Sequence, residues 1–348
     1  MWYNTFMAVS NNRFQEPDSV HHLVSRIAHR VFFMKDDECN DFVVMMRRVA
    51  AFCGIRLIGW CIMTNHFHIL VHLPVRPDVI DEDEILRRVK ILKGSAGAEQ
   101  LIGELARHRA QGAEEEVART LDRLRARMYD LGEFMKTLKQ WFSQEYNRRF
   151  SHVGTLWESA YHDKGVPMKV SDMAKVLAYI HLNPIRAAIV TGFTEYTWSS
   201  LTAALKGDVE AIDGLRFAYG AEEASPEELI DTHCDLMETL LEEIKRKRAE
   251  EIARKRAAGY EVQTDALTSE AYVAQAAAHL EKVLEADVEI KEEARRYARS
   301  AAKREALEAR LRELKSSNPD ISIDELVATL GVSRASVYRL LKASQFQV

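Results

Sequence analysis

The sequence predicts an α+β domain followed by an all-α region, and three observations support this prediction. Two apolar, β-rich runs near the N-terminus enclose a segment with helical spacing. Past about residue 225 the composition is almost entirely that of helices. The 348 residues, of which 47% are hydrophobic and 29% charged, are sufficient for two or three folded domains and do not have the composition of a disordered chain.

The first 80 residues contain the predicted strands. The apolar runs cover residues 22–33 and 55–73, and the second is too long for one strand. Its polar pair Thr64-Asn65 predicts a turn that splits it in two. Between the runs, residues 41–52 carry apolar side chains at helical spacing. The order strand, helix, strand, strand is typical of an α+β sheet with helices on one face.

Helices are expected in most of the remaining chain. Residues 81–128 are dense in glutamate and arginine, which predicts a solvated, charged helical insertion that is broken at the glycines of residues 93–99. A further helix is expected to begin at Ser171, a favourable N-cap, and to end or kink at Pro184. Between them, residues 128–150 predict an amphipathic helix whose apolar face carries Phe134, Leu138, Trp141 and Phe142.

Charge and cysteine content exclude several classes of protein. The four cysteines form no CxxC pair, which argues against a disulfide scaffold and a zinc ribbon. The N-terminus lacks a secretion signal, and no apolar run reaches about 18 residues. We therefore expect a cytoplasmic protein with no membrane partner. Because the formal net charge is −5, any nucleic-acid surface must be local.

The first candidate for chemistry is His66-Phe67-His68. Positions i and i+2 of a strand point to the same face, so two imidazoles can hold one divalent ion while Phe67 packs into the core. His72 falls on the same face farther along. Taken alone, the pattern fits ordinary surface or core histidines as well.

The second candidate is Tyr179, with Asn183 four residues later. On a helix these positions share a face, so a phenol and an amide can converge on one ion. Tyrosine can act as a covalent nucleophile once it is activated. The alternative is a tyrosine at the edge of a helix's apolar face.

The flanking residues connect the two candidates. Residues 65–70 (NHFHIL) are followed by 146–149 (YNRR), by 154–158 (GTLWE) and by 179–187 (YIHLNPIRA). In this order the segments resemble the REP-associated tyrosine transposases of the single-tyrosine HUH transposase superfamily. The resemblance covers roughly residues 20–200 without the charged insertion, which is longer than expected. Ser159-Ala160-Tyr161 also departs from the family, because relatives carry a basic residue just after the Trp-Glu pair.

The resemblance implies an antiparallel-sheet, HUH endonuclease-like fold of the ferredoxin or RRM type. It implies that His66, His68 and Asn183 hold Mg²⁺ or Mn²⁺. Tyr179 would attack a phosphate of single-stranded DNA and form a 5′-phosphotyrosine. Imidazole ligands favour Mn²⁺ over Mg²⁺.

The C-terminal residues 321–343 resemble a helix-turn-helix of recombinases and small regulators. Ser322 and Glu325 form a capping-box pattern, Val327 is expected to pack, and Gly331 stands at the turn. An ordinary helical hairpin is the alternative. The side chains expected to face a DNA major groove are Arg334, Ser336, Tyr338, Arg339 and Lys342.

Other basic residues could contact a DNA backbone. Cations beside the aromatic residues Trp141 and Tyr146 suit a single strand. The candidate DNA contacts outside the C-terminus are Lys136, Lys139, Arg148, Arg149 and Arg186.

Together, these features predict a metal-dependent transposase that cleaves and rejoins single-stranded, hairpin-bearing repeat DNA. We expect a catalytic domain over residues 1–205, a helical connector over 206–315 and a helix-turn-helix over 316–348 that binds double-stranded DNA. The protein would be bacterial and nucleoid-associated, as a monomer or homodimer. One alternative is a domesticated, inactive DNA-binding protein that acts through the helix-turn-helix. A replication or relaxation initiator is disfavoured, because such proteins usually carry a three-histidine motif.

Overall fold

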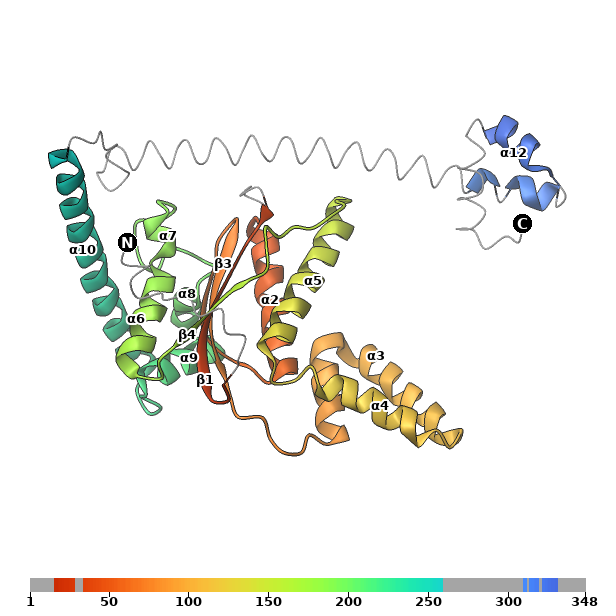
Figure 1. Ribbon diagram of the computed structural model, residues 1–348, viewed down its shortest axis with the longest axis horizontal. Helices are drawn as coiled ribbons and strands as arrows, with labels where there is room; N and C mark the ends of the chain where they lie inside the picture. The colour runs from red at the N-terminus through yellow and green to blue at the C-terminus, as the bar shows by residue number, and fades with distance from the viewer. Residues whose placement is uncertain (1–15, 29–33, 259–308, 312, 319–320, 331–348) are drawn as a thin grey trace. The chain divides into compact units, whose positions relative to one another are not determined.

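Four strands form one antiparallel sheet in the computed structural model, which describes residues 16–28, 34–258, 309–311, 313–318 and 321–330 (Figure 1). The strands are β1 (Ser19–Arg26), β2 (Arg56–Ile62), β3 (His66–Leu73) and β4 (His162–Val166), in the order β2-β3-β1-β4. Neighbouring strands are antiparallel throughout. Helix α2 (Asp36–Cys53) separates β1 from β2 along the chain. The α+β class and the predicted order strand, helix, strand, strand are confirmed.

The predicted split between β2 and β3 is also confirmed. The Met63 N–H donates to the carbonyl of His66 at 2.8 Å and closes the turn around Thr64 and Asn65. The first strand is shorter than the apolar run that predicted it, because β1 ends at Arg26. Residues 29–33 of that run lie outside the described part of the chain.

Helices cover both faces of the sheet. Figure 1 shows α2 and α5 (Leu131–Phe150) on one side, and α6 (Val170–His181), α8 (Ser200–Leu205), α9 (Val209–Tyr219) and α10 (Pro226–Ala257) on the other. On the α2 side, the Phe42 ring packs 4.7 Å from Phe67 and 5.2 Å from Phe142 between ring centroids. Of the four apolar residues predicted for α5, Phe134, Leu138 and Phe142 are buried and Trp141 is half-buried.

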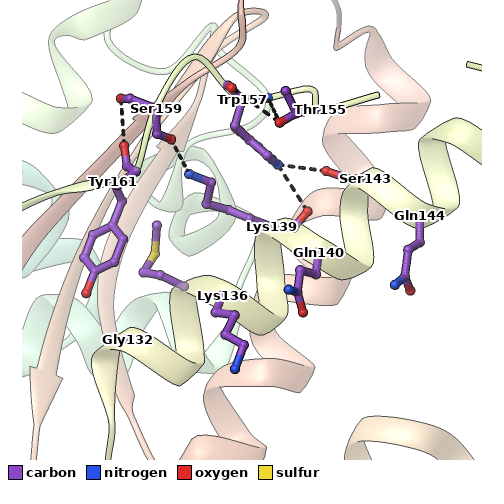
Figure 2. A pocket seen from close by; sticks show the side chains of 12 residues that line it. Gly132, Lys136, Lys139, Gln140, Ser143, Gln144, Thr155, Trp157, Ser159 and Tyr161 are labelled. Atoms are coloured by element: carbon purple, nitrogen blue, oxygen red, sulfur yellow. Dashed lines mark hydrogen bonds between the residues drawn. The ribbon is translucent and has the colours of Figure 1, made fainter. Parts of the chain in front are cut away.

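The chain that enters β4 is held against α5 by Trp157. The Trp157 indole N–H donates to Ser143 Oγ at 2.9 Å and to the carbonyl of Lys139 at 3.2 Å (Figure 2). Its ring stands edge-on to Phe67, with centroids 5.7 Å apart. Trp157 therefore joins the α5 layer to the core of the sheet.

Helix α6 lies close against β2 because Gly59 has no side chain. A Cβ atom at Gly59 would lie 2.3 Å from Leu177 Cδ1 and 2.8 Å from Ser200 Oγ. The helix begins at Val170, and its N-cap is Lys169, so the predicted cap at Ser171 is wrong. Lys169 has extended backbone and its carbonyl accepts the N–H groups of Asp172 and Met173, which leaves Ser171 inside the first turn.

Pro184 ends α6 as predicted. The helix stops at His181, and the short helix α7 (Asn183–Arg186) follows with the proline in its first turn. Proline lacks an N–H and fits the first turn of a new helix, where that donor has no helical partner. The break sets Asn183 and Arg186 just beyond the end of α6.

A buried chain of hydrogen bonds joins α6, α8, α9 and α10. Ser200 Oγ lies 2.7 Å from His181 Nε2, and His181 Nδ1 lies 2.7 Å from His233 Nε2. His233 Nδ1 lies 2.9 Å from the hydroxyl of Tyr219. Ser200 Oγ also accepts the N–H of Trp60 at 2.9 Å. Every polar atom of the two imidazoles is thus paired while both rings remain neutral.

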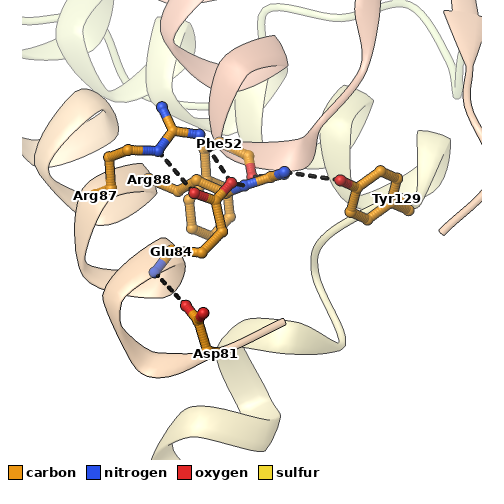
Figure 3. Close-up of polar contacts among 6 residues, drawn as sticks. All are labelled: Phe52, Asp81, Glu84, Arg87, Arg88 and Tyr129. Carbon is orange, nitrogen blue, oxygen red and sulfur yellow. Dashed lines mark hydrogen bonds and ion pairs between the residues drawn. The ribbon is translucent and has the colours of Figure 1, made fainter. Parts of the chain in front are cut away.

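The charged insertion is helical, as predicted. It forms α3 (Glu82–Ala110) and α4 (Glu114–Arg125), and Gly94 interrupts α3 with φ of 76°. Arg88 anchors it: its guanidinium donates to Glu84 at 2.5 Å, to Tyr129 at 2.8 Å and to the carbonyl of Phe52 at 3.3 Å (Figure 3). Because Arg88 is buried against the end of α2, the first turns of α3 are fixed to the α+β domain.

The chain divides into two units. The larger holds the described residues up to 145 and from 154 to 258, and the smaller holds residues 146–153 and the described residues from 309 onward. In the smaller unit, α12 (Ile323–Leu330) begins at the predicted capping box, in which Ser322 Oγ accepts the Glu325 N–H at 3.2 Å. Val327 packs against buried Leu326, as expected. The rest of the predicted helix-turn-helix lies outside the described residues.

Among the described residues, no helix combines the length and apolar character needed to cross a membrane.

Candidate active site

Three histidines meet on the α6 side of the sheet. His66 and His68 share one face of β3, and Phe67 between them is buried in the opposite layer. The antiparallel register of β1 and β3 adds His22, whose Nε2 lies 3.0 Å from His68 Nδ1. The His22 and His68 rings stack with centroids 5.2 Å apart, and the His66 ring stands edge-on to His68 at 5.1 Å. We call His22, His66 and His68 the histidine cluster.

The histidine cluster is held in the neutral form. Burial, reinforced by the Lys164 ammonium, lowers the pKa of His22 to about 3. Burial and then the Arg26 guanidinium lower the pKa of His66 to about 4. Burial also lowers the pKa of His68 well below its usual range, with neighbouring His22, His66, Arg186 and Arg26 acting in the same direction. Neutral imidazoles are the form that binds a metal ion.

The charges that act on the histidine cluster are positive. Arg26 lies at the end of β1, Lys164 is in β4 directly opposite His22, and Arg186 closes α7. Each of these three cations lowers the pKa of at least one histidine of the cluster. The electrostatic environment of the cluster therefore favours an anion such as a phosphate.

Tyr179 is linked to the histidine cluster by Arg186. The Arg186 guanidinium carbon lies 4.5 Å from the centroid of the Tyr179 ring, and the same side chain lowers the pKa of His68. Helix α6 packs against β2 and β3, on the face of the sheet that carries the cluster. The half-buried Tyr179 and the buried His68 thus share Arg186 as a neighbour.

Asn183 has a local structural role in this site. Its Nδ2 donates to the carbonyls of Tyr179 and Ile180, both at 3.1 Å, which caps the end of α6. Its Oδ1 accepts a long hydrogen bond of 3.4 Å from Arg186 Nη1. Only Oδ1 could therefore contribute to a metal shell without loss of the cap.

The donor chemistry of the histidine pair fits a divalent ion. A metal-bound imidazole usually donates its other N–H to a neighbouring acceptor. His66 Nδ1 lies 2.6 Å from Asn65 Oδ1, an acceptor, which leaves the lone pair on His66 Nε2. His22 can accept in the same way from His68 Nδ1. Within the described ranges, no group of three or more His, Cys, Asp or Glu side chains is arranged to hold a metal, so an amide, water or a phosphate would complete the shell.

The other predicted site residues lie in different places. His72 shares the face of the cluster, but it pairs with Asp18 at 2.8 Å and stacks on Phe217. Lys136 and Lys139 lie on α5, in the layer on the other side of the sheet. Arg148 and Arg149 occupy the last turn of α5. The candidate contacts Arg334, Ser336, Tyr338, Arg339 and Lys342 lie outside the described residues.

Sequence reasoning missed His22, Arg26 and Lys164. Each is remote from the motif along the chain, and only the pairing of β1 with β3 and β4 brings them to it. The sequence offered one signal for these residues. His22 and Arg26 are four residues apart, so in a strand they share one face.

No protein-family model matches the sequence, and no curated protein matches it. A function for this chain must therefore be argued from the site itself.

Proposed function

We propose that the protein is a metal-dependent, single-tyrosine DNA transposase that cleaves and rejoins single-stranded, hairpin-containing repeat DNA. The proposal includes an HUH endonuclease-like fold for the α+β domain and a C-terminal helix-turn-helix. The observation that carries it is the position of Arg186, which stacks on Tyr179 and acts electrostatically on His68. One guanidinium thus links the candidate nucleophile to the candidate metal ligands.

The charge of the site supports a phosphodiester substrate. Arg26, Lys164 and Arg186 surround neutral histidines, so a phosphate that enters meets positive charge. Arg186 also positions the Tyr179 ring beside this charge. Fixed cations of this kind stabilise the negative charge that grows on phosphate oxygens during displacement. His66 and His68, with Asn183 Oδ1, would hold Mg²⁺ or Mn²⁺, which supplies further neutralisation of the phosphate when bound.

The reaction exchanges one phosphodiester for another. The Tyr179 oxygen attacks phosphorus, and the bond from phosphorus to the 3′-oxygen of the upstream strand breaks. The phenol proton passes to water, and the departing oxygen takes up a proton to become a 3′-OH. The downstream strand remains joined to Tyr179 through its 5′-phosphate. Attack by another 3′-OH reverses the step and rejoins DNA, so no nucleotide cofactor is required.

A second candidate function is DNA binding without catalysis. The Asn183 side chain favours this function, because its amide nitrogen bonds to the carbonyls at the end of α6, a structural role that needs no catalysis. A binding protein of this kind would recognise the same DNA and leave it intact.

Hairpin DNA copied from the repeats that flank the gene distinguishes the two functions. The wild type, Tyr179→Phe and the matched control Tyr129→Phe would be incubated with the hairpin and Mg²⁺ or Mn²⁺, then run on a denaturing gel. We expect an SDS-resistant, metal-dependent adduct for the wild type and the control, and none for Tyr179→Phe. An adduct that persists in Tyr179→Phe would contradict the nucleophile. Tight binding without an adduct, for both ions and several hairpins, would establish the binding function instead.

A further inference from the structure

A groove of about 650 Å³ lies between α5 and the chain that leads into β4 (Figure 2). Its floor includes Lys136, Lys139, Gln140 and Gln144 of α5, and Tyr161 stands on the opposite wall. None of the 12 described residues that line it is an aspartate or a glutamate. The groove therefore combines two lysines and an aromatic wall with a lining that contains no carboxylate.

The helix side of the groove offers hydrogen-bonding groups in a row. Lys136, Gln140 and Gln144 follow one another at four-residue intervals, so they share one face of α5, and Figure 2 shows them projecting from the helix. From Gly132 to Gln144 this row is about 18 Å long at 1.5 Å per residue. In the part of the chain that the structure describes, the side chains of Gln140 and Gln144 form no hydrogen bond, so their amides can donate and accept elsewhere.

Lys139 places an uncompensated positive charge in this groove. Its ammonium donates to the carbonyl of Ser159 at 2.9 Å and lies 5.1 Å from the centroid of the Trp157 ring. Among the described residues no carboxylate pairs with it, whereas Lys136 pairs with Glu133 at 2.7 Å. Partial burial lowers the pKa of Lys139 to about 8. A half-buried cation that faces only a carbonyl and a ring is complementary to an anion.

The groove is distinct from the candidate active site. Trp157 packs on Phe67, whose side chain points away from the face that carries His66 and His68. The groove wall continues from Tyr161 directly into β4, where Lys164 acts on His22. Because β4 is an edge strand, only one strand separates the groove from the histidine cluster.

We propose that this groove binds a short stretch of single-stranded DNA, with a backbone phosphate at Lys139, base edges along Gln140 and Gln144, and a base against Tyr161. This inference rests on the proposed function and adds a second contact region for its substrate. Single-strand sites combine backbone-tracking cations with aromatic side chains, and the groove supplies both. DNA held there would reach the histidine cluster by crossing the edge of β4.

Binding of a fluorescent oligo(dT) to the full chain in EDTA tests the groove, because chelation prevents cleavage. Lys139→Met is compared with Lys90→Met, an exposed lysine of α3. We expect Lys139→Met to weaken binding about tenfold and to reduce the slope of log affinity against log salt by about 0.7, the value for one phosphate contact on a single strand. Lys139→Arg should keep both close to wild type, because it keeps the charge.

A second pair of variants is independent of the half-buried lysine. Gln144→Glu places a negative charge on an exposed groove position, and Gln111→Glu makes the same change at the end of α3. We expect at least a threefold weaker affinity for Gln144→Glu alone. If each variant matched its control in affinity and in salt slope, in both pairs, the proposal that the groove binds DNA would be wrong. Displacement of oligo(dT) by poly-glutamate of equal charge at equal concentration would also overturn it, because the site would then select charge alone.

Failure of the proposed function gives a different result. If the wild type forms no adduct while Lys139→Met still binds oligo(dT) more weakly than Lys90→Met, the groove is retained and the catalytic proposal fails.

Discussion

The buried chain Ser200–His181–His233–Tyr219 should make the larger unit sensitive to acid. Burial lowers the pKa of His233 from 6.5 to about 4, whereas the same histidine in the unfolded chain protonates near 6.5. Between these values the unfolded state binds more protons than the folded state. The free energy of unfolding is therefore unaffected above about pH 6.5 and falls as the pH falls towards 4.

The size of the effect follows from that difference. At pH 5, about 1.5 units below the unfolded pKa and at roughly 1.4 kcal/mol per unit, His233 alone lowers the free energy of unfolding by about 2 kcal/mol. His233→Gln should cost about 2 kcal/mol near pH 7.5, because it disturbs the hydrogen bonds of 2.7 Å to His181 and 2.9 Å to Tyr219. It also removes the proton uptake. The two proteins should therefore become nearly equal in stability at about pH 5.

Urea unfolding followed by tryptophan fluorescence measures this difference. Trp60 is a suitable reporter, because it is buried and its backbone N–H donates to Ser200 Oγ. His162→Gln, an exposed change on β4, controls for the substitution itself. A gap between wild type and His233→Gln that stays constant or widens from about pH 7.5 to about pH 5 would refute the reasoning.

Three further predictions concern single side chains. His22→Ala should weaken Mn²⁺ binding about 10–100-fold, because it removes the acceptor that orients His68. Electron paramagnetic resonance of free Mn²⁺ measures the affinity, and an unchanged affinity would show that His22 does not support the metal site. Arg88→Met should lower the free energy of unfolding by about 2 kcal/mol, because it removes the hydrogen bonds to Tyr129 and to the Phe52 carbonyl of α2. A urea midpoint equal to that of wild type would contradict the role of Arg88 as an anchor of α3. Ser322→Ala should destabilise α12 by about 1 kcal/mol; amide hydrogen exchange of α12 checks it, with unaltered protection as the opposing result.

Local sequence patterns predicted the helices and strands correctly where a pattern was compatible with only one structure. The polar pair Thr64-Asn65 in an apolar run indicated two strands, and the structure closes a turn there. The period of apolar residues identified α5, although its first turn begins at Leu131 and not at residue 128. The N-cap of α6 was predicted at Ser171, because serine is a better capping residue than lysine. In the structure, the extended backbone of Lys169 makes Lys169 the N-cap instead.

The site was only partly predictable from sequence. Spacing placed His66 with His68 within one strand, and Tyr179 near Asn183 because only four residues separate them along the chain. His22 and Lys164 could not be found in this way, because strand register joins them to His68 across long stretches of chain. Spacing also could not show that the Asn183 amide bonds to the carbonyls at the end of the preceding helix, α6.

Mass spectrometry of the DNA attachment site would show directly whether Tyr179 is the nucleophile. The adduct would be trimmed with nuclease and digested with trypsin, which releases residues 176–186 as one peptide with Tyr179 as its only tyrosine. We expect a nucleotide joined through its 5′-phosphate to Tyr179 on this peptide, together with a released strand that ends in a 3′-OH. A nucleotide on any other peptide, or attached through a 3′-phosphate, would contradict it.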